Sequence, residues 1–312
     1  MLLFGPVPSR RLGHSLGINN IPPKRCSYSC LYCQLGPTKS TEIRLSSFYE
    51  PEYIFDQVVK RLQLLKVRHE SVDYLTFVPD GEPTLDVGLG KTIELLRGLN
   101  IKIAIISNAS LIWQPRVRES LKLADWVSLK VDSVDKSIWQ RINQPNKELV
   151  LEKILSGMLT FAEDFTGTLA TETMLLDGIN TADDSIERLV AFLQKLAPDI
   201  VYLAIPTRPT ADRSVSAPGA ETINHIYQTV NRVMPHVELL TGYEGNAFAS
   251  TGNFTEDILA ISSVHPMRKE AVLQLLAKTG ENWSALQHLL ETGKLREIEY
   301  QGNIFYLRSD HP

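Results

Sequence analysis

Three cysteines, Cys26, Cys30 and Cys33, lie within eight residues of one another and are the only cysteines in the 312-residue chain. An odd, clustered set does not suit a disulfide framework, so it indicates metal or redox chemistry in a reducing compartment. Iron–sulfur clusters normally take four thiolates, and three would leave one iron open to a small chelating molecule. With His14 as a fourth ligand, the same thiolates could instead form a zinc site.

Hydrophobic periodicity predicts the elements that must position these cysteines. Apolar runs typical of strands alternate with segments of helical period through most of the chain. Residues 4–15 contain several prolines and glycines, and we expect them to form an ordered loop. The alternation predicts parallel strands with crossover helices, in an open doubly wound sheet or a barrel. The expected strands are 16–19, 72–78, 101–107, 126–131, 168–176, 200–206 and 237–241, and the expected helices are 51–70, 85–99, 115–123, 149–164, 182–196 and 218–233.

Polar motifs fall at or just beyond the carboxyl ends of these strands, where ligands gather in both architectures. Glu172, in the middle of its strand, is the exception, and if buried it would need a partner such as Lys130. The turn-like motifs could instead be ordinary caps, but their shared position predicts one composite site. Its candidate residues are Asp80, Gly81, Glu82, Pro83, Ser107, Asn108, Lys130, Asp132, Glu172, Ile205 and Arg208, with Arg10, Arg11, Tyr243 and Glu244 as further candidates.

The cysteine spacing, with Tyr32 before the last cysteine, resembles the signature of the radical S-adenosylmethionine (radical SAM) superfamily. The resemblance implies that Cys26, Cys30 and Cys33 hold a 4Fe–4S cluster whose open iron binds SAM. An electron from the reduced cluster would cleave SAM and give a 5′-deoxyadenosyl radical, which abstracts hydrogen from a substrate. The resemblance also implies a partial (β/α)6 barrel and a reductase such as flavodoxin or ferredoxin.

The strand-end motifs extend this resemblance. Asp80-Gly81-Glu82-Pro83 is similar to the family's Gly-Gly-Glu-Pro motif, which contacts the amino group of SAM, with Asp80 in place of the first glycine. Ser107-Asn108 is similar to the family's ribose-contacting pair. The resemblance implies further SAM contacts at Lys130, Asp132, Glu172, Ile205 and Arg208.

Segments 4–13, 177–180, 205–209 and 243–245 resemble a poorly characterised radical SAM group that is distantly similar to the wybutosine-synthesising tRNA enzymes. Those enzymes carry additional cysteines for a second cluster. This chain has none, so the resemblance does not extend to a second cluster. The substrate stays open among a peptide or protein, a tRNA and a small metabolite.

The last part of the chain has a different pattern. Residues 246–254 are small and polar, and we expect them to link a barrel domain, residues 1–245, to a small domain, residues 255–312. The small domain shows three helical segments and a hairpin, which predicts a winged helix-turn-helix with a solvated His265 before its second helix. The segments are 255–262, 267–278, 282–291, 295–299 and 304–307.

Charge disfavours nucleic acid as the partner of this domain. Residues 254–312 hold six Lys or Arg and eight Asp or Glu, and the last helix has no Lys or Arg. Because phosphate contacts dominate nucleic-acid affinity, DNA is not the expected partner, and we favour a peptide or protein docked there. The functional alternative to a radical SAM enzyme is therefore a non-catalytic zinc-binding adaptor that uses the winged helix for interaction.

The whole chain has a net charge of −4 and a pI near 6.0, so it has no bulk attraction to nucleic acid or anionic membranes. Its first residues lack the positive region of a signal peptide, and no apolar run approaches the roughly 18 residues of a membrane span. We expect a cytoplasmic protein.

Overall fold

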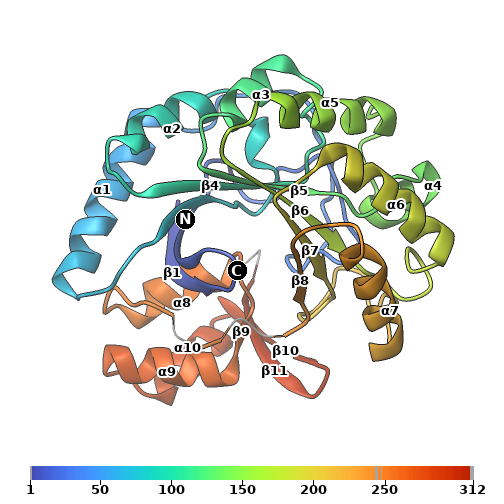
Figure 1. Ribbon diagram of the computed structural model, residues 1–312. Helices are drawn as coiled ribbons and strands as arrows, with labels where there is room; N and C mark the ends of the chain where they lie inside the picture. The colour runs from blue at the N-terminus through green and yellow to red at the C-terminus, as the bar shows by residue number, and fades with distance from the viewer. Residues whose placement is uncertain (1, 243–244, 247, 310–312) are drawn as a thin grey trace.

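The computed structural model describes residues 2–242, 245–246 and 248–309. Its frame is one eight-stranded sheet in the order β1 to β8, in which β2 to β8 are parallel and β1 is antiparallel to β2. The sheet curls into a partial barrel (Figure 1), which confirms the predicted α/β class. The strands are β1 Leu3–Ser9, β2 Gly13–Ile18, β3 Tyr74–Phe77, β4 Lys102–Ser107, β5 Trp126–Lys130, β6 Thr168–Met174, β7 Ile200–Ala204 and β8 Val237–Leu240.

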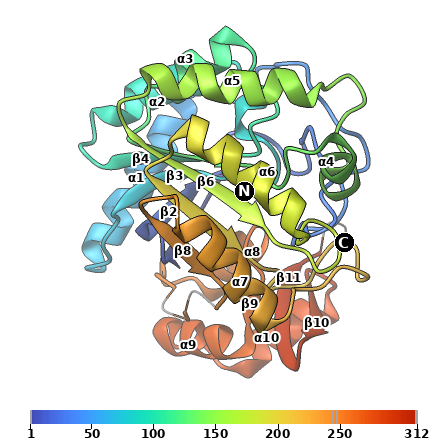
Figure 2. The same cartoon turned by 45° about the vertical axis from the view of Figure 1, so that its right-hand side comes forward.

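Helices cover the outer face of this sheet (Figure 2). All six predicted helices are present, and the second begins later than expected because a short 3-10 turn, η1, precedes it. The sequence prediction missed α4, an eight-residue helix that Asp135 caps through the backbone N–H groups of Ser137 and Ile138. The helices are α1 Pro51–Val67, η1 Pro83–Leu85, α2 Leu89–Arg97, α3 Pro115–Leu121, α4 Lys136–Asn143, α5 Leu151–Asp164, α6 Asp183–Leu196 and α7 Ala220–Asn231.

Side chains alternate between the two faces of each strand, so the core has two layers. In β4, Ile103 and Ile105 pack under the helices, whereas Ala104 belongs to a separate cluster. That cluster contains Trp126, the first residue of β5, and Tyr202, whose rings lie 6.5 Å apart. Aromatic rings therefore fill the barrel interior toward the amino ends of the strands and leave the carboxyl ends for a site.

The prediction of a loop at residues 4–15 is wrong, because β1 and β2 form an antiparallel pair there. Proline lacks a backbone donor, but β1 is an edge strand, where Pro6 and Pro8 are tolerated. The pairing shifts between Phe4 and Val7. The Phe4 ring lies so close to Gly17 that a Cβ there would come within 2.0 Å of it.

The C-terminal elements form a compact module against β1 (Figure 1). Their core includes Phe4 and Val7 of β1, so the module packs on the edge strand of the partial barrel. The element order is that expected for a winged helix-turn-helix; both this assignment and the division into domains stay predictions. The elements are α8 Phe254–Ser262, β9 Met267–Arg268, α9 Lys269–Thr279, α10 Trp283–Glu291, β10 Leu295–Tyr300 and β11 Asn303–Arg308, with sheet order β10-β11-β9.

The prediction of a solvated His265 is wrong. Only 7% of His265 is exposed, and its Nε2 lies 3.0 Å from Nη2 of Arg208, on the segment after β7. Gln34 also contacts the segment that contains His265, and its side chain donates to the carbonyl of Val264 at 2.9 Å. The C-terminal module therefore contacts the residue that follows Cys33. No helix in the described ranges has the length and apolar character needed to cross a membrane.

Burial, together with the positive charge of Arg208, lowers the pKa of His265 well below its usual value. The unfolded chain binds a proton at His265 below about pH 6.5, where the folded chain does not, so His265 should cost stability as the pH falls. From about pH 8 to about pH 5.5, the unfolding free energy of the wild type should drop by more than that of His265→Gln. Denaturant titrations at both pH values test this, and equal drops would contradict it.

Candidate active site

The carboxyl ends of the parallel strands surround a cavity of about 320 Å³. All three cysteines line it, from the loop that follows β2. The structure therefore brings together residues that are up to 232 positions apart in the chain, from Arg10 to Gly242, as the strand-end pattern predicted. The lining residues from the predicted set are Cys26, Cys30, Cys33, Asp80, Gly81, Lys130, Glu172, Ile205 and Arg208, and Arg10 and Arg11 join them.

Backbone hydrogen bonds hold the cysteine loop on both sides. On one side, Lys24 N–H donates to the carbonyl of Asp80 at 2.7 Å, and Glu82 N–H donates to that of Arg25 at 2.9 Å. On the other side, Ser29 N–H donates to the carbonyl of Asn143 at 3.0 Å. The loop is thus fixed between the segment after β3 and the end of α4.

The thiols are only partly exposed, and their surroundings disfavour the ionised form. Burial, followed by the negative charge of Asp132, raises the pKa of Cys30 to about 12, and burial also raises the pKa values of Cys26 and Cys33. A metal centre would have to supply the charge that stabilises the thiolates. Three soft sulfur ligands in one cavity are the donor set that an iron–sulfur cluster requires.

A single zinc ion and a cluster make different demands on the same cysteines. Zinc needs its sulfur ligands about 2.3 Å from one point, whereas a cluster spreads its cysteines over different irons. Within the described residues, no three His, Cys, Asp or Glu side chains converge on one ion position. His14, the zinc alternative's fourth ligand, lies near the amino end of β2, with its Nδ1 3.0 Å from Ser71 Oγ. It is at the opposite end of β2 from the cysteine loop.

Glu82 is fully buried, and its carboxylate is enclosed by protein donors. Oε1 accepts from Thr84 N–H at 3.0 Å, Thr84 Oγ1 at 2.6 Å and Ser107 Oγ at 2.7 Å, and Oε2 accepts from Asn108 N–H at 2.7 Å. Burial raises the pKa of Glu82, and these donors oppose that shift. Glu82 therefore ties the segment after β3 to the end of β4. Its implied contact with SAM stays a prediction.

Some of the residues near Glu82 line the cavity, and others hold the neighbouring segments in place. Asp80 and Gly81 line the cavity, and Asp80 Oδ1 lies 3.4 Å from Lys24 Nζ. Pro83 is buried and begins η1. Asn108 turns its amide toward the cysteine loop, with Nδ2 2.9 Å from Ser27 Oγ and 3.5 Å from Cys26 Sγ.

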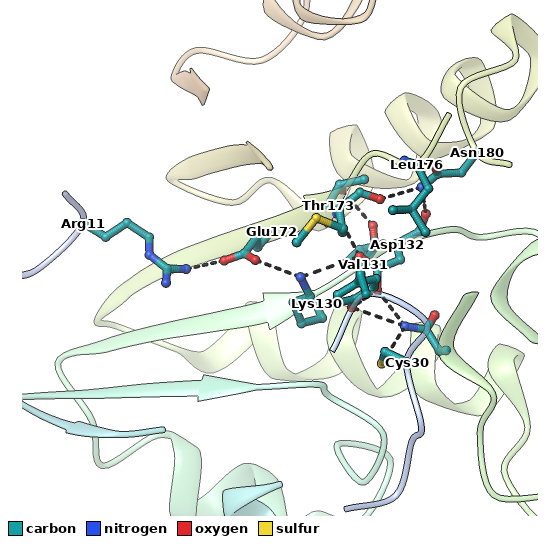
Figure 3. A network of polar contacts seen from close by, with 12 residues as sticks. Arg11, Cys30, Lys130, Val131, Asp132, Glu172, Thr173, Leu176 and Asn180 are labelled. Atoms are coloured by element: carbon teal, nitrogen blue, oxygen red, sulfur yellow. Dashed lines mark hydrogen bonds and ion pairs between the residues drawn. The ribbon is translucent and has the colours of Figure 1, made fainter. Parts of the chain in front are cut away.

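An ionic chain crosses the interior of the barrel (Figure 3). Glu172 accepts from Lys130 Nζ at 2.8 Å and from Arg11, which confirms Lys130 as the partner that a buried Glu172 would need. Burial favours the neutral acid, but Lys130 and Arg11 outweigh it and lower the pKa of Glu172 to about 2. The carboxylate is therefore ionised at neutral pH. Arg11 also lies over the Tyr202 ring, 5.8 Å from its centroid.

Asp132 lies behind this chain, with no exposed side-chain area. Its Oδ1 accepts from Met174 N–H at 2.9 Å and lies 3.8 Å from Lys130 Nζ. Its Oδ2 accepts from Tyr32 Oη and from Asn143 Nδ2. The structure thus places Asp132 between the cysteine loop and β6, and its implied SAM contact stays a prediction.

Ile205 and Arg208 form the wall that follows β7, and Arg208 Nη1 donates to Gln34 Oε1 at 2.9 Å. Tyr243 and Glu244 lie outside the described residues. The sequence prediction missed Gln34 and Asn143. Gln34 follows Cys33 directly, which is a usable signal, whereas Asn143 ends a helix that was itself missed.

Comparisons with known proteins agree with this fold. The family model of the radical SAM superfamily matches residues 20–207. UPF0026 protein MJ1312 of Methanocaldococcus jannaschii is 47% identical over 310 residues, covering 99% of this chain and 96% of that protein. The chain therefore belongs to the radical SAM superfamily and, within it, to the UPF0026 family.

Two further matches cover a smaller share of the protein that is matched. The GTPase Obg of Brachyspira hyodysenteriae is 32% identical over 310 residues, which are 97% of this chain and 45% of that protein. A solved structure of TYW1 with a lysine–pyruvate adduct bound has a TM-score of 0.56 and 16% identity, and the match covers 72% of this chain and 76% of that one. At this identity the likeness shows a shared fold.

Substitution of Gly81 directly tests how the cysteine loop is held. Its φ is +152°, and a Cβ there would lie 1.9 Å from the carbonyl oxygen of Arg25, the residue before Cys26. We expect Gly81→Ala to push the cysteine loop outward and to lower the iron content after reconstitution by more than half. Gly178→Ala, at φ +61° with nothing within 4 Å of the added carbon, is the matched control and should keep its iron. Equal iron content in both variants would contradict this account of the loop.

Proposed function

We propose that this protein is a radical SAM enzyme in which Cys26, Cys30 and Cys33 hold a 4Fe–4S cluster and the adjoining cavity binds SAM. The observation that carries the proposal is that three partly buried thiols and the strand-end polar groups line one cavity. When bound and reduced, the cluster supplies the single electron that cleaves the S–C5′ bond of SAM. The residues of the chain bind, orient and shield the reactants.

The charged and apolar side chains that line the cavity suit a zwitterionic nucleoside such as SAM. Asp80 offers a carboxylate beside Cys33 for the amino group of SAM, and Arg11 and Arg208 offer guanidinium groups for its carboxylate. Ile106 and Ile205 provide apolar surface for the adenosine. A cavity of about 320 Å³ is at the small end for ligand sites, so SAM would occupy much of it. The substrate then approaches from the mouth.

The substrate and the electron donor are defined by class only. We propose a reductase such as flavodoxin or ferredoxin as the donor. The contacts of Gln34 with Val264, and of Arg208 with His265, join the cavity wall to the C-terminal module. These contacts support a peptide or protein substrate that docks on this module and extends to the cavity; a tRNA or a small metabolite is the alternative.

Anaerobic reconstitution tests the proposed reaction. The purified protein, loaded with iron and sulfide and given SAM and dithionite, should hold about four irons per chain and release 5′-deoxyadenosine and methionine. Cys33→Ala removes one cluster ligand while leaving the ionic chain intact, and it should release at least 100-fold less. Absence of 5′-deoxyadenosine from an iron-loaded wild type would refute the proposal.

Metal analysis separates this proposal from the zinc-binding adaptor. Protein purified without oxygen should contain iron and sulfide with little zinc. About one tightly bound zinc per chain and no iron would favour the adaptor.

A further inference from the structure

We propose that Asn143 is a positioning residue for the cysteine-bound cluster, whose side-chain amide donates a hydrogen bond to Cys30 and raises the reduction potential. Asn143 is the last residue of α4 and only 2% exposed, and its Nδ2 lies 3.4 Å from Cys30 Sγ. This inference rests on the proposed function, because it concerns the cluster held by these cysteines. It adds a residue that contacts a cysteine sulfur but binds neither iron nor SAM.

The orientation of this amide is fixed by a carboxylate. Asn143 Nδ2 donates to Asp132 Oδ2 at 2.7 Å, and Met174 N–H donates to the other oxygen, so both oxygens of this carboxylate act as acceptors. The nitrogen of the amide, rather than its oxygen, must therefore face Asp132. One N–H is directed to Asp132, and the second faces Cys30 Sγ at 3.4 Å, with Tyr32 Oη beside it at 3.5 Å.

Asp132 is itself held in place. Met174 N–H and Tyr32 Oη donate to its two oxygens, and Lys130 Nζ lies 3.8 Å from Oδ1. Figure 3 shows this chain of contacts from Arg11 at the cavity wall, through Glu172, Lys130 and Asp132, toward Cys30. The amide of Asn143 is the step that connects the chain to sulfur.

The electrostatic consequence follows from the charge that the cluster gains on reduction. A hydrogen bond to a cysteine sulfur stabilises this added negative charge, and burial strengthens the bond. Asn108 is placed in the same way, with Nδ2 3.5 Å from Cys26 Sγ. Two of the three cysteines therefore accept a side-chain amide. Asn143 is the clearer test, because Asn108 is also an implied SAM contact and its side chain bonds Ser27 and Ser110.

Redox titration of the reconstituted protein, followed by electron paramagnetic resonance of the reduced cluster, tests this proposal. At a fixed applied potential, Asn143→Ala should show about tenfold less reduced relative to oxidised cluster than the wild type, which is about 59 mV for one electron. Asn146→Ala is the matched control. Its amide donates to the carbonyl of Thr41 at 2.9 Å, in the same region but not to sulfur, so it should keep the wild-type potential.

A second variant tests whether the lost N–H donor, rather than the lost side-chain volume, causes the change. Asn143→Leu keeps a side chain of similar size but has no donor, so this variant should show the same lowered potential. If either variant holds the cluster at the wild-type potential, Asn143 does not tune the cluster and the proposal is overturned, while the proposed function stands. Loss of the cluster from both variants would show a purely structural role and also overturn it. A wild type that holds no cluster would refute the proposed function itself, and this inference with it.

Discussion

The enclosed carboxylate of Glu82 is the interaction on which the site depends. A buried carboxylate is costly unless hydrogen bonds satisfy it, and Glu82 has four donors, from Thr84, Ser107 and Asn108. Those bonds fix the end of β4 against the segment after β3. Through its backbone the same segment holds Lys24 and Arg25, the residues that lead into Cys26. The placement of the first cysteine therefore depends on a carboxyl group that does not reach solvent.

A second group of charges organises the other side of the cavity. Arg11, Lys130 and Glu172 come from three different parts of the chain and meet across the barrel interior. Because the pKa of Glu172 is lowered to about 2, the chain stays ionised over the physiological pH range. Fixed charges that need no rearrangement when a ligand binds are a general means of preorganising a site. Here they also lie next to Asp132, which orients the amide that reaches Cys30.

Much of this architecture could be predicted from the sequence, because its signals are local. Alternating apolar periods predicted the parallel sheet, and polar residues after each strand predicted the shared cavity. Other features depend on context that a local pattern does not contain. Pro6 and Pro8 argue against a strand unless it lies at an edge, and the buried state of His265 depends on a contact with Arg208, 57 positions earlier. Asn143 was missed because α4 is a short helix in which Trp139 and Ile142, but few other residues, are apolar and buried.

The central claim is that three cysteines hold a cluster with one iron open to SAM. The most direct measurement is electron–nuclear double resonance on the reduced, reconstituted protein with SAM labelled with ¹⁵N at its amino group. The account predicts a ¹⁵N hyperfine coupling from the bound nitrogen, which a ¹⁴N coupling should replace when unlabelled SAM is used. A reduced cluster whose spectrum is the same with and without SAM would contradict the account.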